Sequence, residues 1–366
     1  MDSATQILLG AAVGEAVMGR RVGPKAMAWG AACGLFPDLD ILIPLGDAVK
    51  NFTYHRGASH SLFVLALLTP LVVKLIVKRH PQTAEHRRRW FALVFLAFAT
   101  HVLLDCFTVY GTQIFWPLAT PPVMWSTLFI IDPAYSIPLL AGVLAALRWR
   151  QTPLGWRLNL VCLGLSTLYI AWSVGAKLHV ERIAREALAR QQIGHERILT
   201  VPTAFNTALW RILVMDREGY HEGFYSLLDG DRQPRFERHP SRPELLAHVA
   251  DHWPVRRLQW FTHGFYAVSQ EGRDIVITDL RMGMEPSYIF RFRVAEAADG
   301  RIRPGPSRRV ASPQRLAQLA WVWQRIWKPI PPSDPLYGAF HLFSGSGDGP
   351  SPGPAFPARI PWRHAG

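Results

Sequence analysis

The sequence predicts an α-helical polytopic membrane domain of five to six apolar helices, followed by a small β-rich extracytoplasmic domain of α+β type. Two observations support this fold class. Residues 1–177 contain long apolar runs with few carboxylates. Residues 200–366 are rich in arginine, proline and aromatic residues and have no apolar run long enough to cross a bilayer. The average of 49% hydrophobic residues hides these two unlike halves, whose composition changes near residue 178.

Six apolar segments can be drawn in the first half, and several are shorter than the ~20 residues that an upright span requires. They are residues 5–18, 26–45, 62–77, 90–107, 130–147 and 158–176. The first is the weakest, and it either spans the membrane, re-enters it or packs against its neighbours. The whole of residues 1–177 is expected to form the membrane domain that contains the functional site.

The short loops predict the orientation, because lysine and arginine near the ends of a span favour the cytoplasmic side. Basic residues gather in loops 20–25, 78–89 and 148–157, which are therefore expected inside. The C-terminal domain is then expected outside. Much of the formal net charge of +13 sits in such loops, and no basic-aromatic recognition motif suggests a nucleic acid partner at the membrane site.

The second half is expected to begin with an amphipathic helical stalk over residues 178–199, followed by a β-rich soluble domain over 200–340 and a disordered tail over 341–366. Short β-branched and aromatic runs predict the strands. They are residues 209–215, 224–228, 260–268, 274–278 and 287–294. Ser312-Pro313 predicts the start of a helix that runs through Trp327.

Ionisable residues inside apolar segments cost about 2.5–3.5 kcal/mol each on insertion scales, so each needs a partner or a function. Five aspartate and histidine residues of these segments and two histidines of the outer loop between the second and third segments are expected at the outer membrane face. They suit a divalent ion such as Zn²⁺, Mn²⁺, Fe²⁺ or Mg²⁺. The candidate metal ligands are Asp38, Asp40, His55, His60, His101, Asp105 and Asp132. Seven ligands are more than the four that one tetrahedral site needs. One or two ions are therefore expected, with zinc as the first choice.

Each motif also has a structural explanation. Asp38 or Asp40 would cap backbone amides after Pro37, and an isolated His-x4-His pair in a loop is more often structural or solvated. His101 and Asp105 share one helix face at i, i+4 and would otherwise form a hydrogen-bonded core pair. The coincidence of all these residues at one membrane face favours the metal site.

The three cysteines lie in apolar segments without CxxC spacing, so neither a thiolate site nor a disulfide framework is indicated. Arg56, in the loop before His60, is a candidate for binding an anionic substrate group, although an arginine in an outer loop is as often merely solvated.

These motifs together resemble the LexA-regulated, membrane-bound, metal-dependent hydrolases of bacteria. The matching elements cover about residues 3–150 in order. They are Phe36-Pro37-Asp38-Leu39-Asp40, His55-Arg56-Gly57-Ala58-Ser59-His60-Ser61, His101-Val102-Leu103-Leu104-Asp105 with Thr108 and Tyr110-Gly111-Thr112, Phe115-Trp116-Pro117 and Asp132-Pro133.

The resemblance implies a hydrolase of the bacterial inner membrane, distantly similar to zinc phospholipase C and single-strand nuclease folds. Together with the loop charges, it predicts a multi-pass protein with its C-terminal domain in the periplasm. Many members have histidine after the second aspartate, where this chain has Ile41, so one ligand of the family pattern is unmatched. The β-rich half looks like an extension found in a subset of the family.

The expected function is hydrolysis of a phosphoester by metal-activated water, with Asp38, Asp40 and Asp105 as candidate catalytic carboxylates. A site level with the lipid headgroups would reach a phospholipid or a lipid-linked phosphate. Two alternatives remain open, namely a transporter with an intramembrane cation site and a non-catalytic metal scaffold that presents the C-terminal domain to an envelope partner. The sequence does not define the oligomeric state.

Overall fold

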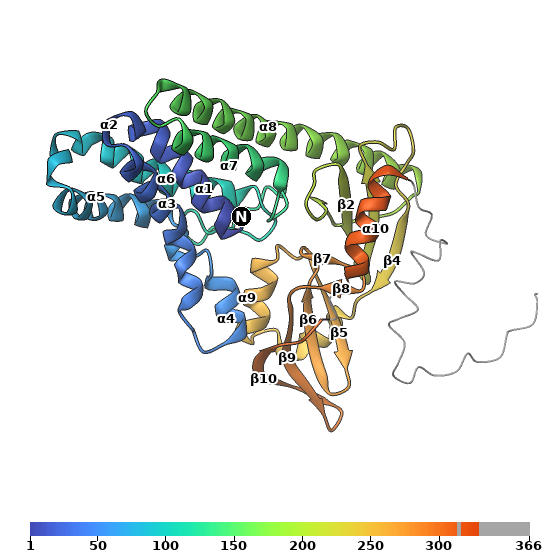
Figure 1. Cartoon of the computed structure of the whole chain (residues 1–366). Helices are drawn as coiled ribbons and strands as arrows, with labels where there is room; N and C mark the ends of the chain where they lie inside the picture. Colours follow the sequence, from blue (N-terminus) through green and yellow to red (C-terminus); the bar gives the residue numbers. More distant parts are fainter. Residues whose placement is uncertain (313–315, 329–366) are drawn as a thin grey trace, which may run out of the picture. The chain divides into compact units, whose positions relative to one another are not determined.

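The computed structural model describes residues 1–312 and 316–328, and Figure 1 shows how their elements follow one another. All of these residues belong to one compact unit. The change of composition near residue 178 therefore marks a change of secondary structure, while the helical half and the sheets pack together.

The first half is helical, and each of the six expected apolar segments contains a helix. The elements are α1 (Ser3–Gly14), the π-helical turn η1 (Glu15–Gly19), α2 (Arg20–Val22), α3 (Pro24–Leu35), the 3₁₀ helix η2 (Phe36–Leu42), α4 (Ala48–Tyr54), η3 (Ala58–His60), α5 (Leu62–Arg79), η4 (Pro81–His86), α6 (Arg87–Cys106), α7 (Pro133–Arg148) and α8 (Pro153–Arg190).

Within the described residues, two helical stretches are long and apolar enough to cross a membrane, Pro81–Cys106 and Pro153–Arg190. A third span results if Ala48–His60 and Leu62–Arg79, bent by 55°, are counted as one. Helices α1 and α3 have 12 residues each. Each therefore measures about 18 Å, short of the ~30 Å hydrocarbon core. Two to three candidate spans follow, and the five or six expected from the sequence stay a prediction.

Helices α1 and α3 touch through their backbones, because glycines face each other where they cross. A Cβ on Gly10 would lie 2.2 Å from the carbonyl oxygen of Gly30, and a Cβ on Gly30 would lie 2.1 Å from that of Gly10. Small residues allow such close approach of helices in membranes. This packing matters for the site described below, because α1 contributes Gln6 and α3 contributes the Gly34 carbonyl.

Replacing Gly30 with alanine is therefore expected to push α1 and α3 apart and to destabilise the fold by about 1–3 kcal/mol, as overpacking of a close contact does. Gly164→Ala in α8 is the matched control, because no atom lies within 4 Å of a Cβ at that position. Thermal unfolding in detergent should show a lower melting temperature for Gly30→Ala alone. Equal melting temperatures for both variants would contradict this account of the crossing.

Helix α8 continues without a break for 38 residues, so the stalk expected over 178–199 is the second part of a longer helix. It does not stand free. Val180 and Ala184 are buried against Trp210 and Ile212 of the first sheet. That sheet already begins at Arg197, within the expected stalk.

The second half is built on two antiparallel sheets, with strand orders β1-β2-β3-β4 and β10-β9-β6-β5, and a hairpin β7-β8. The strands are β1 (Arg197–Pro202), β2 (Leu209–Met215), β3 (Gly219–Ser226), β4 (Phe236–Pro240), β5 (Tyr266–Glu271), β6 (Asp274–Asp279), β7 (Gly283–Met284), β8 (Ser287–Tyr288), β9 (Arg291–Ala298) and β10 (Arg301–Arg309). The helices are η5 (Pro243–Val249), α9 (Trp253–Phe261) and α10 (Leu316–Trp327).

The expected β-rich character is confirmed, and strands 209–215 and 274–278 coincide with β2 and β6. The strand expected over 260–268 is wrong. Its first residues end helix α9, which buries Val255, Leu258 and Phe261 at intervals of three, and β5 begins only at Tyr266. The expected C-terminal helix is confirmed as α10. Its proposed start at Pro313 and the tail 341–366 lie outside the described residues.

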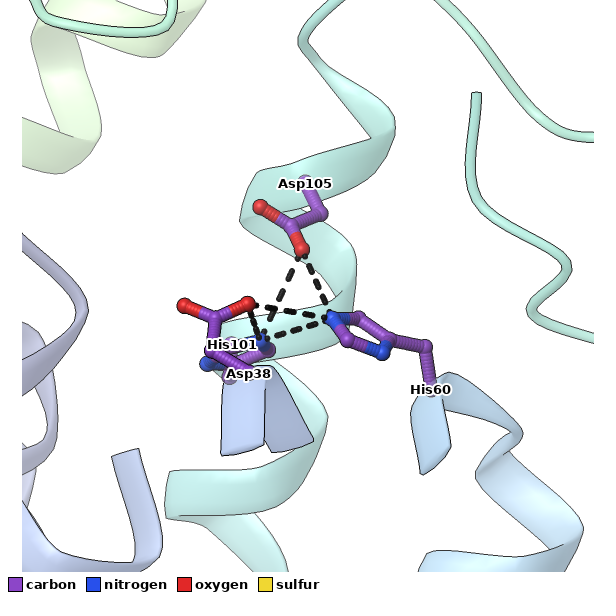
Figure 2. A group of neighbouring side chains, drawn as sticks. All are labelled: Asp38, His60, His101 and Asp105. Atoms are coloured by element: carbon purple, nitrogen blue, oxygen red, sulfur yellow. Dashed lines mark hydrogen bonds and ion pairs between the residues drawn. The ribbon is translucent and has the colours of Figure 1, made fainter. Parts of the chain in front are cut away.

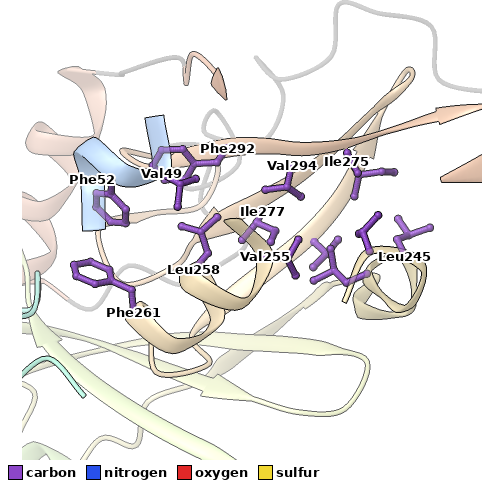
Figure 3. Packing of buried hydrophobic residues seen from close by; sticks show 14 of the residues in the cluster. Val49, Phe52, Leu245, Val255, Leu258, Phe261, Ile275, Ile277, Phe292 and Val294 are labelled. Atoms are coloured by element: carbon purple, nitrogen blue, oxygen red, sulfur yellow. The ribbon is translucent and has the colours of Figure 1, made fainter. Parts of the chain in front are cut away.

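Helix α4 joins the two halves, although it lies in the connection before His60 that the sequence predicts as an outer loop. Val49 and Phe52 enter a core formed with α9 and the second sheet, as Figure 3 shows. The Phe52 ring lies 4.9 Å from the Phe261 ring and 5.1 Å from the Phe292 ring, measured between centroids. The chain that leaves α4 leads directly to His55 and His60, so the second half anchors the loop that contains these two histidines.

A second contact joins the halves on the far side of α9. The pKa of His263 is lowered by burial and by the nearby Arg281 guanidinium, so the ring is neutral near pH 7. Its Nε2 lies 2.8 Å from the carbonyl oxygen of Pro122, to which it donates a hydrogen bond. The loop between α6 and α7 is thus bound to the second half as well.

Candidate metal centre

Four of the predicted ligands meet in one place, although they come from three separate elements. Asp38 lies in η2, His60 in η3, and His101 and Asp105 lie one turn apart on α6. Figure 2 shows their side chains pointing toward one another. One donor atom of each lies within 4.8 Å of the others, and this is the one such group of histidine, cysteine or acidic residues found among the described residues.

The distances within this cluster suit a small cation. His60 Nε2 lies 3.2 Å from His101 Nε2, 3.2 Å from Asp105 Oδ2 and 3.4 Å from Asp38 Oδ1. His101 Nε2 lies 3.5 Å from Asp105 Oδ2 and 3.6 Å from Asp38 Oδ1. Four ligands at zinc's usual bond lengths would stand roughly 3.3–3.6 Å apart at the corners of a tetrahedron. The residues present therefore fit a divalent ion.

The hydrogen bonds on the outer side of each imidazole define which nitrogen faces the cluster. His101 Nδ1 lies 2.6 Å from the Gly34 carbonyl, which can only accept, so Nδ1 is the protonated nitrogen. Ser59 Oγ donates to Asp40 and lies 2.9 Å from His60 Nδ1, so it accepts a hydrogen bond from that nitrogen. With Nδ1 protonated in both rings, the neutral form of each presents an Nε2 lone pair to the two carboxylates.

The centre of the cluster is consequently short of hydrogen-bond donors. Two imidazole lone pairs and two carboxylate oxygens face one another, and Asp105 Oδ2 is buried without a hydrogen-bond partner. His60, His101 and Asp105 have no exposed surface. A proton would serve two of the four atoms at a time, whereas a metal ion binds all four. The orientation of each histidine by a second partner is also typical of metal ligands.

The other oxygen of Asp105 is bound by donors from α1 and from the loop before His60. Oδ1 accepts from Gln6 Nε2 at 3.0 Å, from Arg56 Nη2 at 3.3 Å and from the amino group of Met1. Gln6 also donates to the His101 carbonyl. Gln6 is absent from the residues that the sequence singles out, but a polar side chain in a weak apolar segment is a signal that could have identified it.

Arg56 is buried rather than solvated. Besides Asp105, it donates to Thr108 Oγ1 at 3.0 Å, and its guanidinium carbon lies 4.9 Å from the centre of the Tyr110 ring. These contacts hold the Arg56 side chain beside Asp105, which is one of the four candidate ligands. A role for Arg56 in binding substrate stays a prediction.

Asp40 and His55, also predicted as ligands, lie one hydrogen bond outside the cluster. Asp40 Oδ1 lies 2.7 Å from His55 Nδ1, and Oδ2 accepts from the Arg56 backbone amide at 3.1 Å and from Ser59. Through Ser59, Asp40 orients the His60 ring. Ile41, where many members of the resembled family have histidine, is 71% exposed, unlike the buried ligands.

Asp132 has a different set of contacts. It precedes α7, accepts from the Ala134 amide at 3.1 Å as the helix N-cap, and accepts from the Tyr169 hydroxyl at 3.0 Å. The structure does not bring Asp132 into the group of four. The N-cap explanation, which the sequence analysis applied to the Asp38-x-Asp40 motif, describes Asp132 instead.

Asp132→Ala is therefore expected to leave metal binding unchanged and to cost about 0.5–2 kcal/mol of stability through the lost cap. Metal content and thermal unfolding of the same purified sample measure both effects. Asp38→Ala is the comparison, since it removes one of the four clustered oxygens. If the Asp132 variant were fully folded but bound no metal, Asp132 would have to be counted among the ligands, in addition to the four clustered residues.

Comparison with known proteins agrees with the membrane half of this description. Residues 1–179 match the model of the family described as YdjM inner membrane protein. The chain is also 25% identical over 230 residues to the uncharacterized protein YfhP of Bacillus subtilis (strain 168), an alignment that covers 61% of this chain and 68% of that protein. No solved structure matches the chain. Over residues 1–179, which hold all four clustered side chains, the chain therefore carries the sequence pattern of the YdjM inner membrane protein family.

Proposed function

We propose that this membrane protein is a metal-dependent hydrolase of phosphoester bonds, with a divalent ion, zinc first, held by Asp38, His60, His101 and Asp105. The supporting observation is the meeting of two imidazole lone pairs and two carboxylate oxygens in a buried centre. An ion bound there supplies Lewis acidity, which activates water and offsets negative charge on phosphoester oxygens in the transition state.

The protein's own groups suggest how substrate and protons reach this centre. Asp38 retains a small exposed surface, whereas the other three ligands have none, so approach from the Asp38 side is the open route. The Asp40–His55 pair lies beside that route and is partly exposed. A carboxylate hydrogen-bonded to an imidazole can act together with it as a proton acceptor. We infer that this pair takes the proton from the attacking water, while Arg56 holds Asp105 in place.

The surface beside Asp38 favours a lipid-bearing substrate. Large apolar side chains of η2 and the residues after it are exposed next to the two aspartates. They are Phe36, Leu39, Ile41, Leu42, Ile43 and Leu45. A contiguous apolar surface of this kind marks a membrane or partner contact. A phospholipid or a lipid-linked phosphate would be brought to the ligands by such a segment, and we propose this substrate class.

The test uses full-length protein from which metal has been removed with a chelator. We expect zinc or manganese to bind at one equivalent and to restore cleavage of bis(p-nitrophenyl) phosphate and of phosphatidylglycerol in mixed micelles. Asp132→Ala should retain both metal and turnover, whereas Asp38→Ala should lose both. Stoichiometric metal with no turnover on either substrate would contradict the hydrolase.

A non-catalytic metal centre is the second candidate, and one observation favours it. Four protein ligands complete a tetrahedral zinc site, and closed sites of that kind are usually structural. If the metal centre is structural, metal removal should lower the melting temperature strongly. The protein should then hydrolyse neither substrate at any metal concentration.

A further inference from the structure

An apolar cavity lies in a different part of the molecule from the four ligands. Its volume is about 380 Å³, within the range of roughly 300–1,000 Å³ typical of small-molecule pockets. Its wall comes from the segment before α7, the end of β1 with the loop that follows, the β7–β8 hairpin and α10. Representative wall residues are Val109, Ile130, Val201, Met282, Leu319 and Val322.

The charged groups in the wall are already paired. Arg211 donates to Glu222, to the Leu280 carbonyl and to the Tyr288 hydroxyl. Arg281 donates to both oxygens of Asp279, at 2.9 and 2.7 Å. Because each guanidinium is neutralised by a carboxylate, the cavity favours an apolar occupant over an anion.

Helix α8 indicates the depth of this cavity in a bilayer. The apolar segment 158–176 of α8 follows the basic loop 148–157, so Tyr169 and Trp172 lie in the last two turns of the span. At that level Tyr169 and Trp172 both bond to Thr207, in the loop after β1. Tyrosine and tryptophan are the side chains enriched at membrane interfaces. The loop that forms one wall therefore lies at the boundary of the hydrocarbon core.

Helix α7 gives a second, independent measure. Its 16 residues measure about 24 Å, less than the ~30 Å core, so the apolar residues 128–131 that precede it fall at or just inside the boundary. These residues also line the cavity. Both helices place the cavity at the same level, at the end of the spans away from the α7–α8 connection.

The rim is apolar and exposed, so it connects the cavity to the lipid-facing surface. Ile131 and Leu319, which line the cavity, are 46% and 41% exposed. Phe205 follows the lining residue Ala204 and is 45% exposed. Phe205 contacts Phe129, with ring centroids 5.6 Å apart. Along α10, Trp323 and Trp327 continue the exposed stripe that begins at Leu319, with helical spacing.

We propose that this cavity binds one acyl chain of a membrane lipid, which enters past Ile131, Phe205 and Leu319 from the adjoining leaflet. The headgroup would remain at the interface, beside the tryptophans of α10. The proposal is independent of the metal centre and of hydrolysis, because it rests on the shape, depth and apolar wall of a cavity built from other residues.

The test is photolabelling of the full-length protein in nanodiscs of phosphatidylethanolamine and phosphatidylglycerol that contain a small fraction of a phospholipid with a diazirine at the end of one acyl chain. After irradiation and proteolysis, mass spectrometry maps the adducts. We expect adducts within 201–204 or 282–289, in addition to those on lipid-facing helix surfaces. Adducts confined to the lipid-facing surfaces of α5–α8 would overturn the proposal.

Two variants narrow the interpretation. Ala204→Trp fills the cavity, and Leu319→Trp obstructs its rim at a partly exposed position that tolerates a larger side chain. Each is expected to lose the adducts at 201–204 and 282–289. Leu168→Trp, which adds the same indole at an exposed position of α8, should leave them unchanged. Adducts that persist in both cavity variants, with unchanged melting temperature, would also overturn the proposal.

Discussion

Replacing His60 with alanine is expected to abolish metal binding in the micromolar range while leaving the protein folded. His60 Nε2 is the atom with the shortest contacts to all three other ligands, at 3.2 to 3.4 Å. Removing a residue that merely orients a ligand typically costs about 10–100-fold in metal affinity, so losing a ligand should cost more. Competition with a chromophoric zinc chelator measures the affinity, and thermal unfolding without metal checks the fold.

His55→Ala is the matched control, because it removes an imidazole from the same loop that lies outside the cluster. It is expected to weaken metal affinity by no more than about 10–100-fold, through the loss of support for Asp40. If His55→Ala removes the metal and His60→Ala keeps it, the assignment of inner and outer residues is wrong.

The second large effect is expected for Phe52→Ala. This substitution should lower the free energy of unfolding by about 3–5 kcal/mol, as the loss of a buried phenylalanine ring usually does. The Phe52 ring lies among Phe261, Phe290 and Phe292 in the core that joins the two halves. The backbone carbonyl of Phe52 also accepts from the Tyr110 hydroxyl. Chemical denaturation in detergent measures the change in the free energy of unfolding.

The same variant is expected to weaken metal binding, because α4 leads into the loop that contains His60. Arg257 of α9 donates to the Thr53 carbonyl and hydroxyl, so the second half anchors the end of α4 as well. Phe91→Ala in α6 is the matched control, since its ring is exposed and its removal leaves no internal cavity. A Phe52 variant with parental stability and parental metal affinity would contradict the view that the second half supports the site.

Part of the site could be predicted from the sequence because local spacing determines it. His101 and Asp105 lie one helical turn apart, so any helix there places both on one face, and the structure confirms that they meet. The cost of polar groups in apolar segments also singled out Asp38, which the structure places beside this pair. These inferences need only helix geometry and solvation.

The remaining assignments depend on tertiary distances that residue type does not encode. Asp40 and Asp38 are two residues apart, yet only Asp38 points into the cluster, because the 3₁₀ turn directs neighbouring side chains to different sides. Asp132 is an aspartate at the membrane depth expected for the ligands, but its carboxylate caps the N-terminus of α7. Helix α9 was missed for a related reason, since its aromatic residues suit a strand and only packing against α4 shows that they form a helix face.

X-ray absorption spectroscopy at the zinc edge of the loaded, full-length protein is the most direct test of the central claim. If Asp38, His60, His101 and Asp105 hold the ion, the spectrum should show nitrogen and oxygen neighbours at about 2.0–2.2 Å, with the outer-shell scattering of two imidazoles and no sulfur. A zinc–sulfur distance near 2.3 Å, no imidazole scattering, or failure to bind an equivalent of zinc would contradict the claim.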